Sequence, residues 1–87
     1  MEIEQTLLKH PAVVEAAVIG VPDALRGQIV KAYIVTHDPT EATRAHIQAF
    51  MKTQLSQHEY PRQIEFLDEL PKTPAGKINR NLLRERA

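Results

Sequence analysis

One lysine stands out because the residues around it would hold its charge in a fixed position. Lys77 follows Gly76 in the segment 70–80, which reads LPKTPAGKINR. Pro71 and Pro74 stiffen this segment, and Gly76 permits backbone angles that place Lys77 at a tight bend. A stiff loop with a lysine at its tip presents one positive charge to an anionic partner.

The C-terminal segment as a whole is basic. From Leu70 to Ala87, five basic side chains stand against one acidic side chain, although the 87 residues together carry 11 basic and 11 acidic residues and a formal net charge of zero. This local excess predicts an anionic partner, and the competing interpretation is a solvated basic helix end. The basic residues are Lys72, Lys77, Arg80, Arg84 and Arg86.

Two familiar anion-binding classes do not fit this segment. A phosphate-binding P-loop needs a glycine where Pro71 stands and a serine or threonine where Ile78 stands. A nucleic-acid partner is disfavoured because the net charge is zero and none of the four aromatic residues lies in the basic segment, where bases would stack.

The sequence contains no recognisable set of metal ligands. The 87 residues include no cysteine, which excludes disulfides and thiolate metal sites and fits a reducing compartment. The histidines lack the paired spacing of zinc sites, so we expect no metal and a surface position for each of them. They are His10, His37, His46 and His58.

The sequence shows neither a membrane-spanning segment nor a secretory signal. The longest apolar stretch, Ala16 to Val21, is far shorter than the ~20 residues that a bilayer requires. The N-terminus begins with acidic residues, where a signal peptide would be basic. We therefore expect a soluble, cytoplasmic protein with no membrane partner.

The periodicity of apolar residues predicts the elements that must position Lys77. It indicates a helix over 2–10, strands over 12–19 and 29–36, a helix over 41–57, a strand over 63–67 and a helix over 79–86. The short polar link between the first two strands is typical of an antiparallel pair. Thr40 is the expected N-cap of the second helix, whose apolar stripe includes Ile47 and Met51. The order predicts a single α+β domain over residues 1–87, in which helices cover a small three-stranded sheet.

The sequence resembles a known family. Residues 71–78, Pro-Lys-Thr-Pro-Ala-Gly-Lys-Ile, are similar to the signature Pro-Lys-Thr-x-x-Gly-Lys-Ile/Val in the C-terminal domain of adenylate-forming enzymes: acyl-CoA synthetases, peptide-synthetase adenylation domains and luciferases. Within this family, the sequence of the segment is most similar to that of the acyl-CoA synthetases. Further similar segments span essentially the whole chain: 2–4, 10–13, 16–20, 22–23, 27–28, 31–33, 60–61 and 64–66.

The resemblance implies a catalytic role for Lys77. In this family a large N-terminal domain binds ATP and a carboxylic acid, and a small C-terminal lid domain closes over it in two orientations. One orientation makes the acyl-adenylate, and the other makes the thioester with CoA. The lysine of the Gly-Lys pair enters the first site, so Lys77 takes that role, with Gly76, Pro71 and Thr73 supporting the loop. A fixed ammonium would offset the repulsion between the attacking carboxylate and the α-phosphate.

The resemblance also implies what lies outside these residues. ATP and CoA would be substrates of the parent enzyme, Mg²⁺ would bind in the N-terminal domain, and that domain would be the main partner. The family's hinge and the loop that lines its pantetheine tunnel precede the equivalent of Glu2-Ile3-Glu4. We therefore expect the chain alone to be catalytically inert, and the acyl specificity to reside elsewhere.

Four further residues are candidates for contacts with CoA or with the N-terminal domain. Lys52 lies where some acyl-CoA synthetases place a basic residue near the CoA nucleotide phosphates. Arg26, next to Gly27, could meet CoA or the large domain, and Arg80 could steady the loop or contact that domain. The competing interpretations are a solvated lysine, an ordinary loop arginine and a surface salt bridge.

A second function is also compatible with the sequence. In many acyl-CoA synthetases the equivalent of Lys77 undergoes reversible acylation, which would remove its charge. The domain could therefore act as an interaction module, the substrate of a lysine acetyltransferase and of a deacylase, without catalysis of its own.

Overall fold

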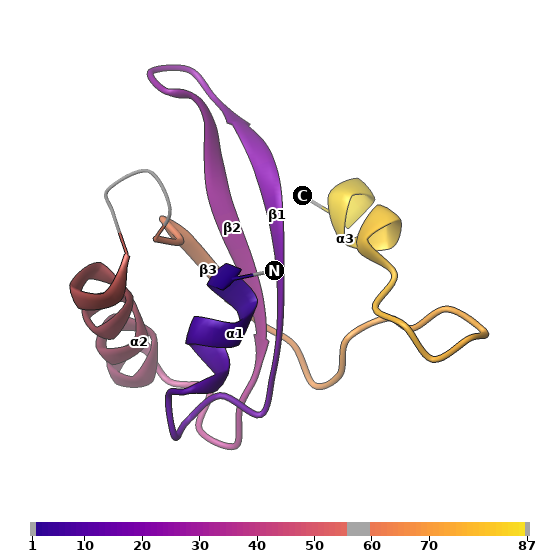
Figure 1. Cartoon of the computed structure of the whole chain (residues 1–87), viewed down its shortest axis with the longest axis horizontal. Helices are drawn as coiled ribbons and strands as arrows, with labels where there is room; N and C mark the ends of the chain where they lie inside the picture. Colours follow the sequence, from indigo (N-terminus) through magenta and orange to yellow (C-terminus); the bar gives the residue numbers. More distant parts are fainter. Residues whose placement is uncertain (1, 56–59, 87) are drawn as a thin grey trace.

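A three-stranded sheet with helices on both faces forms the centre of the molecule (Figure 1). The structure is a computed structural model that describes residues 2–55 and 60–86. The elements are α1 (Glu2–Leu8), β1 (Glu15–Asp23), β2 (Gly27–Val35), α2 (Glu41–Gln54), β3 (Gln63–Phe66) and α3 (Arg80–Arg86). The predicted α+β class and the predicted order of elements are confirmed.

The sheet is mixed, with the strand order β1-β2-β3. β1 and β2 are antiparallel in the register Glu15↔Val35 to Asp23↔Gly27, as the short link predicted. β3 runs parallel to β2, with Ala32 opposite Ile64. Parallel neighbours need a crossover connection, and α2 supplies it.

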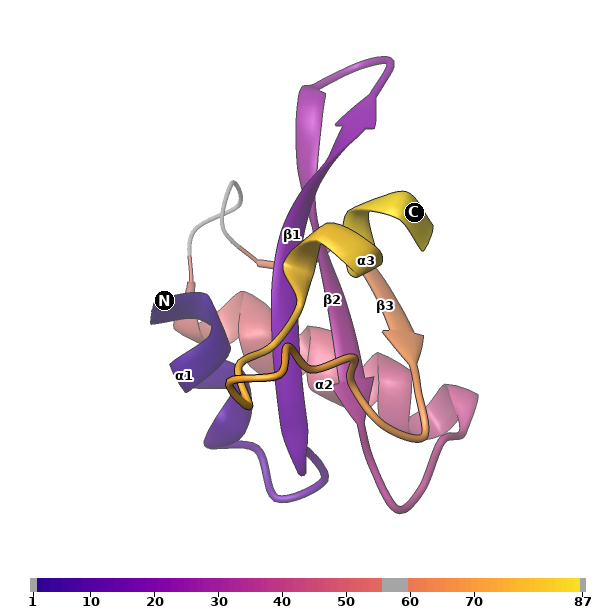
Figure 2. The ribbon, with the colours of Figure 1, turned by 90° about the vertical axis from the view of Figure 1, so that its right-hand side faces the viewer.

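Two apolar cores lie on opposite faces of the sheet because successive strand side chains alternate. Val18 and Ala32 point toward α1 and α2, where Ile47 and Met51 of α2 are fully buried. The other face carries Ile19 and Tyr33, which pack with residues of α3 and the segment before it. Figure 2 shows α2 behind the sheet and α3 in front of it.

The boundaries of α2 follow from its sequence. The side-chain oxygen of Thr40 accepts a hydrogen bond from the Thr43 backbone N–H at 3.2 Å, which confirms the predicted N-cap. The helix ends at Gln54, where the Leu55 N–H donates to the Met51 carbonyl. The predicted end at Gln57 lies outside the described residues.

The first strand differs from its predicted range. β1 begins at Glu15 rather than Ala12 and continues past the predicted end at Ile19 to Asp23. Pro22 is tolerated because β1 lies at an edge of the sheet, where a missing N–H costs little. The turn follows instead at residues 24–26, where the Asp23 carboxylate accepts the backbone N–H groups of Leu25 and Arg26.

Candidate functional site

Lys77 lies on a small hairpin that we define as residues 71–79 and call the Lys77 hairpin. The Thr73 N–H donates to the Lys77 carbonyl at 2.7 Å, and the Lys77 N–H donates to Oγ1 of Thr73 at 3.2 Å. The Gly76 N–H donates to the Thr73 carbonyl at 2.9 Å, and Gly76 has a φ of 83°. Glycine adopts this left-handed conformation without steric cost, which permits the bend just before Lys77.

The two legs of the hairpin are joined at its base. Lys72 and Ile78 form an antiparallel β-bridge, and the Asn79 N–H donates to the Pro71 carbonyl at 2.8 Å. Asn79 also accepts the Leu82 N–H through its side chain, as expected of the cap of α3. The base of the hairpin is therefore continuous with the start of α3.

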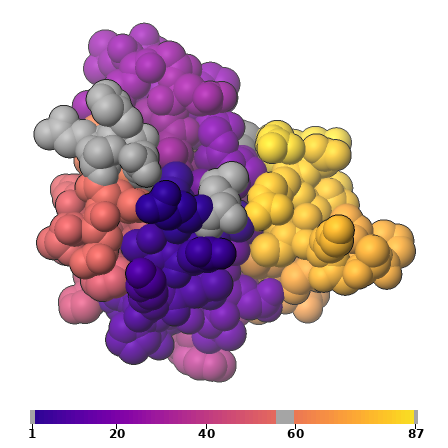
Figure 3. All heavy atoms as spheres, in the orientation of Figure 1, coloured from indigo at the N-terminus to yellow at the C-terminus, as the bar shows by residue number. Residues whose placement is uncertain are grey.

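The tip of the hairpin is exposed. Residues 74–77 are all solvent-exposed, and Figure 3 shows the orange-to-yellow hairpin as a protrusion at the right of the molecule. Within residues 2–55 and 60–86, Lys77 forms no ion pair, whereas Nζ of Lys72 lies 2.8 Å from Glu15 Oε1. The ammonium of Lys77 is thus available to an external anion.

Arg80 pairs with α1 rather than pointing into solvent. Its Nη2 atom lies 2.5 Å and 2.6 Å from the two carboxylate oxygens of Glu4. Oε2 of Glu4 also accepts the backbone N–H of Val18 at 2.8 Å. Glu4 therefore links α1 to both β1 and α3.

The two predicted CoA-contact residues Arg26 and Lys52 lie together. They line an open hollow of about 470 Å³, which we call the cationic hollow, together with Leu55, Tyr60 and Arg62. The Tyr60 ring centroid lies 5.4 Å from Lys52 Nζ and 4.9 Å from Arg62 Cζ. Neither Lys77 nor Arg80 lines this hollow, so the structure separates the candidate residues into two places. Gly27 directly follows Arg26 and has a φ of 78°.

Sequence reasoning did not assign Tyr60 or Arg62 to a site. Arg62 carries no local signal of a functional role. Their position beside Arg26 and Lys52 depends on the parallel pairing of β3 with β2, because Arg62 immediately precedes β3. The only signal was the resemblance of Tyr60-Pro61 to the adenylate-forming family.

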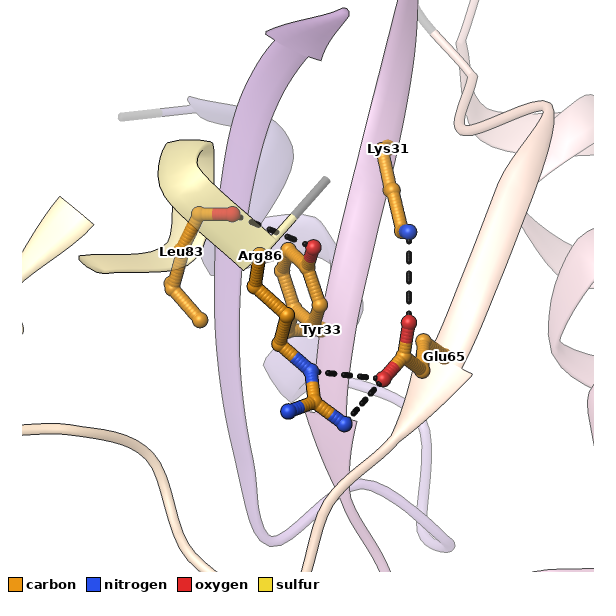
Figure 4. Close-up of polar contacts among 5 residues, drawn as sticks. All are labelled: Lys31, Tyr33, Glu65, Leu83 and Arg86. Atoms are coloured by element: carbon orange, nitrogen blue, oxygen red, sulfur yellow. Dashed lines mark hydrogen bonds and ion pairs between the residues drawn. The ribbon is translucent and has the colours of Figure 1, made fainter. Parts of the chain in front are cut away.

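Several contacts hold α3 against the sheet (Figure 4). The hydroxyl of the fully buried Tyr33 donates to the Leu83 carbonyl at 3.2 Å. Glu65 on β3 accepts from Nε of Arg86 at 2.8 Å and pairs with Lys31 at 3.2 Å. Burial acts to raise the pKa of Glu65, but the hydrogen bonds from Arg86 and Lys31 outweigh it and lower the pKa. The C-terminal half of α3 is thus fastened independently of Arg80.

The prediction that every histidine lies at the surface is wrong for His10. Its side chain is buried, with 4% exposed, and its Nε2 lies 2.7 Å from Nδ1 of His46. Burial, together with the nearby His46, lowers the pKa of His10. His37 and His46 are exposed as predicted, and His58 lies outside the described residues. Over residues 2–55 and 60–86, no three histidine, aspartate or glutamate side chains gather as a metal site would require.

The helices are short by membrane standards. In the described ranges, none has the length and apolar character needed to span a bilayer.

Comparisons with known proteins agree on one family. The profile of the AMP-binding enzyme C-terminal domain matches residues 2–77. The chain is 56% identical to 4-hydroxybutyrate–CoA ligase 1 of Metallosphaera sedula over 98% of its length and 46% identical to the acetyl-coenzyme A synthetase of Bacillus subtilis over 95%. Among solved structures, the acyl-CoA synthetase of Brucella canis matches 98% of the chain with a TM-score of 0.90 and 52% identity.

The matches cover only a small part of each relative. The chain spans 16% of the Metallosphaera sedula protein, 15% of the Bacillus subtilis protein and 16% of the Brucella canis structure.

Proposed function

Because the chain belongs to the family of AMP-binding enzyme C-terminal domains, we propose that it is the lid of an acyl-CoA synthetase and supplies Lys77 to the adenylation of a carboxylic acid. The observation that carries this proposal is the exposed ammonium of Lys77 at the tip of a hydrogen-bonded hairpin, which has no ion-pair partner among residues 2–55 and 60–86. The acyl-CoA synthetase class is supported by relatives whose names denote CoA ligases and synthetases.

The chemistry needs a positive charge of this kind. A carboxylate oxygen attacks the α-phosphorus of ATP, forming an acyl-adenylate and releasing pyrophosphate. Two anions must approach one another, and negative charge gathers on the phosphoryl oxygens as the new bond forms. A preorganised ammonium lowers this barrier because it is already in place when the charge develops. Lysine suits this role, since it carries a compact point charge on a long stem.

The test uses a fusion enzyme in which this chain follows the N-terminal adenylation domain of an acyl-CoA synthetase. Lys77→Ala should lower adenylation, measured as ATP–pyrophosphate exchange, by roughly 100- to 1000-fold. Thioester formation from supplied acyl-adenylate should continue. Arg84→Ala is the matched control, because it removes one charge from an exposed residue of the same basic segment. Equal loss of both half-reactions in Lys77→Ala would contradict the assignment.

The second half-reaction would use a different surface. We propose that the cationic hollow binds the nucleotide phosphates of CoA, with Arg26 and Lys52 as cations and Tyr60 and Arg62 beside them. Gly27 shapes the turn that presents Arg26. The thiol of CoA then attacks the acyl carbonyl and AMP leaves. In this proposal ATP, the acid and Mg²⁺ bind to the N-terminal domain. Catalysis therefore requires that domain, and the 87 residues alone should show no turnover.

A second candidate function rests on the same exposed lysine. We propose that Lys77 is an acceptor for reversible acylation by a lysine acetyltransferase and a deacylase, because its ammonium is accessible while that of Lys72 is held by Glu15. Incubating the chain with an acetyltransferase and acetyl-CoA should acetylate Lys77 ahead of Lys72 in a mass-spectrometric time course. Modification at Lys72 alone would count against this role.

A further inference from the structure

The Lys77 hairpin has two legs, and each ends in an ion pair to the same α1–β1 unit. The N-terminal leg carries Lys72, which pairs with Glu15 at the start of β1. The C-terminal leg leads through Asn79 into Arg80, which pairs with Glu4 of α1. The tip itself is exposed, so the position of Lys77 depends on the base of the hairpin, where these two ion pairs add to the packing of Ile78 against the apolar core under α3.

The two attachments differ in strength. The side chains of Lys72 and Glu15 are 40% and 39% exposed, and exposed pairs of this kind contribute little because water screens them. Arg80 and Glu4 are 34% and 11% exposed, and Glu4 also accepts the Val18 N–H. A partly buried, hydrogen-bonded carboxylate gives a stronger and better-defined contact. The C-terminal leg is therefore the more firmly held.

We propose that Glu4 and Arg80 are positioning residues for Lys77: their ion pair fixes the C-terminal leg of the hairpin to α1 and so sets where the ammonium is presented. Arg80 adjoins Asn79, whose N–H closes the base of the hairpin on Pro71. Movement of Arg80 would therefore break the hydrogen bond between the Asn79 N–H and the Pro71 carbonyl. This bond lies at the base of the hairpin, next to the bridge between Lys72 and Ile78. As a role in catalysis, this inference rests on the proposed function of Lys77.

The geometry also indicates which replacement should preserve the role. Only Nη2 of Arg80 contacts Glu4, and Nε is buried without a hydrogen-bond partner within the described part of the chain. Because the contact uses one nitrogen, a lysine ammonium can replace it, whereas leucine at position 80 cannot. Arg80→Lys should therefore retain the positioning that Arg80→Leu loses.

The first experiment measures amide hydrogen exchange by NMR in this 87-residue chain. In Arg80→Leu, exchange of the Thr73 and Asn79 N–H groups should accelerate at least about tenfold more than that of the Leu55 N–H, which closes α2. In Arg80→Lys, the exchange rates of the Thr73 and Asn79 N–H groups relative to that of the Leu55 N–H should stay as they are in the unmodified chain. Arg86→Leu is the matched control, because it breaks the ion pair of α3 with Glu65 of the sheet and leaves the ion pair between Arg80 and Glu4 in place.

Two results would overturn the proposal. One is uniform acceleration of all three amides in Arg80→Leu, which would mean a loss of global stability only. The other is an equal local effect in Arg86→Leu, which would mean that any loosening of α3 reaches the hairpin. Glu4→Gln should reproduce the effect of Arg80→Leu, because the neutral amide can still accept the Val18 N–H but no longer pairs with the guanidinium.

The second experiment places the same variants in the fusion enzyme. Arg80→Leu should lower the kcat of adenylation about tenfold while thioester formation from supplied acyl-adenylate stays at its original rate, and Arg80→Lys should restore adenylation. Unchanged adenylation in Arg80→Leu, despite a loosened hairpin, would overturn the catalytic part of the inference. If Lys77→Ala itself leaves adenylation intact, the proposed function fails, and the exchange data still decide whether Arg80 positions the hairpin.

Discussion

The imidazole rings of His10 and His46 are joined by a 2.7 Å contact between Nε2 of His10 and Nδ1 of His46. Nδ1 of His10 accepts the Ala12 N–H at 3.0 Å, so in the neutral ring the proton resides on Nε2 and is donated to His46. The rings also meet edge to face, with centroids 4.9 Å apart. This pair links the end of α1 to α2, and it requires Nδ1 of both rings to be unprotonated.

The His10 pair predicts a loss of stability in mild acid. The folded-state pKa of His10 is lower than its ordinary value of 6.5, so between these two values the unfolded chain binds more protons than the folded chain. The contribution to stability is complete above about pH 6.5 and is lost as the pH falls through the folded pKa. Urea unfolding of the chain from pH 8 to pH 5 should show this decline. His10→Gln, which does not titrate, should flatten it, whereas His37→Gln, at an exposed position, should not. An unchanged slope in His10→Gln would assign the decline to other groups.

The hydrogen bond from Tyr33 to Leu83 predicts that its removal lowers the free energy of unfolding. Tyr33→Phe removes the donor and leaves the buried Leu83 carbonyl without it, so the free energy of unfolding should fall by about 1 kcal/mol. Tyr60→Phe, at a half-buried position by the cationic hollow, should change it by less. Chemical denaturation of the two variants under identical conditions makes the comparison. An equal loss in both would mean that the Tyr33 hydroxyl is not a specific support of α3.

Sequence reasoning found the elements because their signals are local. The apolar stripe containing Ile47 and Met51 and the N-cap at Thr40 lie within one helix, and the structure has both. The end of β1 was misplaced because Gly20 and Pro22 are turn residues by type. In the structure they pair with β2 across the sheet, and only that register reveals them as strand residues.

The candidate site was predictable in part for the same reason. Gly76 and Lys77 are adjacent, so their bend could be inferred from residue types. Glu4 and Arg80 are 76 positions apart, and no local pattern connects them. The burial of His10 likewise depends on the packing of α1 against α2, which the spacing of histidines does not encode.

The positive φ of Gly76 gives a prediction about strain. A side chain at φ 83° costs roughly 1–2 kcal/mol even where space is open, and a Cβ at Gly76 would meet no described residue other than its chain neighbours within 4 Å. Gly76→Ala should therefore either destabilise the chain by about this amount or shift the bend and displace Lys77. In both cases adenylation by the fusion enzyme should fall.

Gly27 supplies the comparison for this strain. Its φ of 78° is nearly the same, and a Cβ there would also lie in open space as far as the described part of the chain is concerned, but Gly27 lies at the β1–β2 turn. Gly27→Ala should lower the melting temperature by an amount similar to that of Gly76→Ala. Its ATP–pyrophosphate exchange should fall less than that of Gly76→Ala. If both variants lose exchange in equal measure, the effect comes from stability and not from the position of Lys77.

The cationic hollow predicts that loss of its charges impairs the use of CoA and leaves adenylation intact. Arg26 and Lys52 lie in the hollow with the Tyr60 ring, so removing either charge should weaken the binding of a phosphate-bearing ligand. In the fusion enzyme, Lys52→Gln should raise the KM for CoA about tenfold, the equivalent of about 1.4 kcal/mol, and leave adenylation unchanged. The increase should shrink at high salt, because added ions screen exposed charges.

Dephospho-CoA, which lacks the 3′-phosphate, locates the phosphate that the hollow contacts. If Lys52 pairs with the 3′-phosphate, the unmodified fusion enzyme should prefer CoA to dephospho-CoA, and Lys52→Gln should lose most of that preference. If it pairs with the pyrophosphate, the KM values for both ligands should rise by the same factor, because both retain that group. Lys9→Gln, a change of an exposed lysine just after α1, is the control for the loss of one surface charge. An equal KM for CoA in Lys52→Gln and Lys9→Gln would remove the hollow from the CoA site, since the response would then follow net charge and not the position of Lys52 beside Arg26.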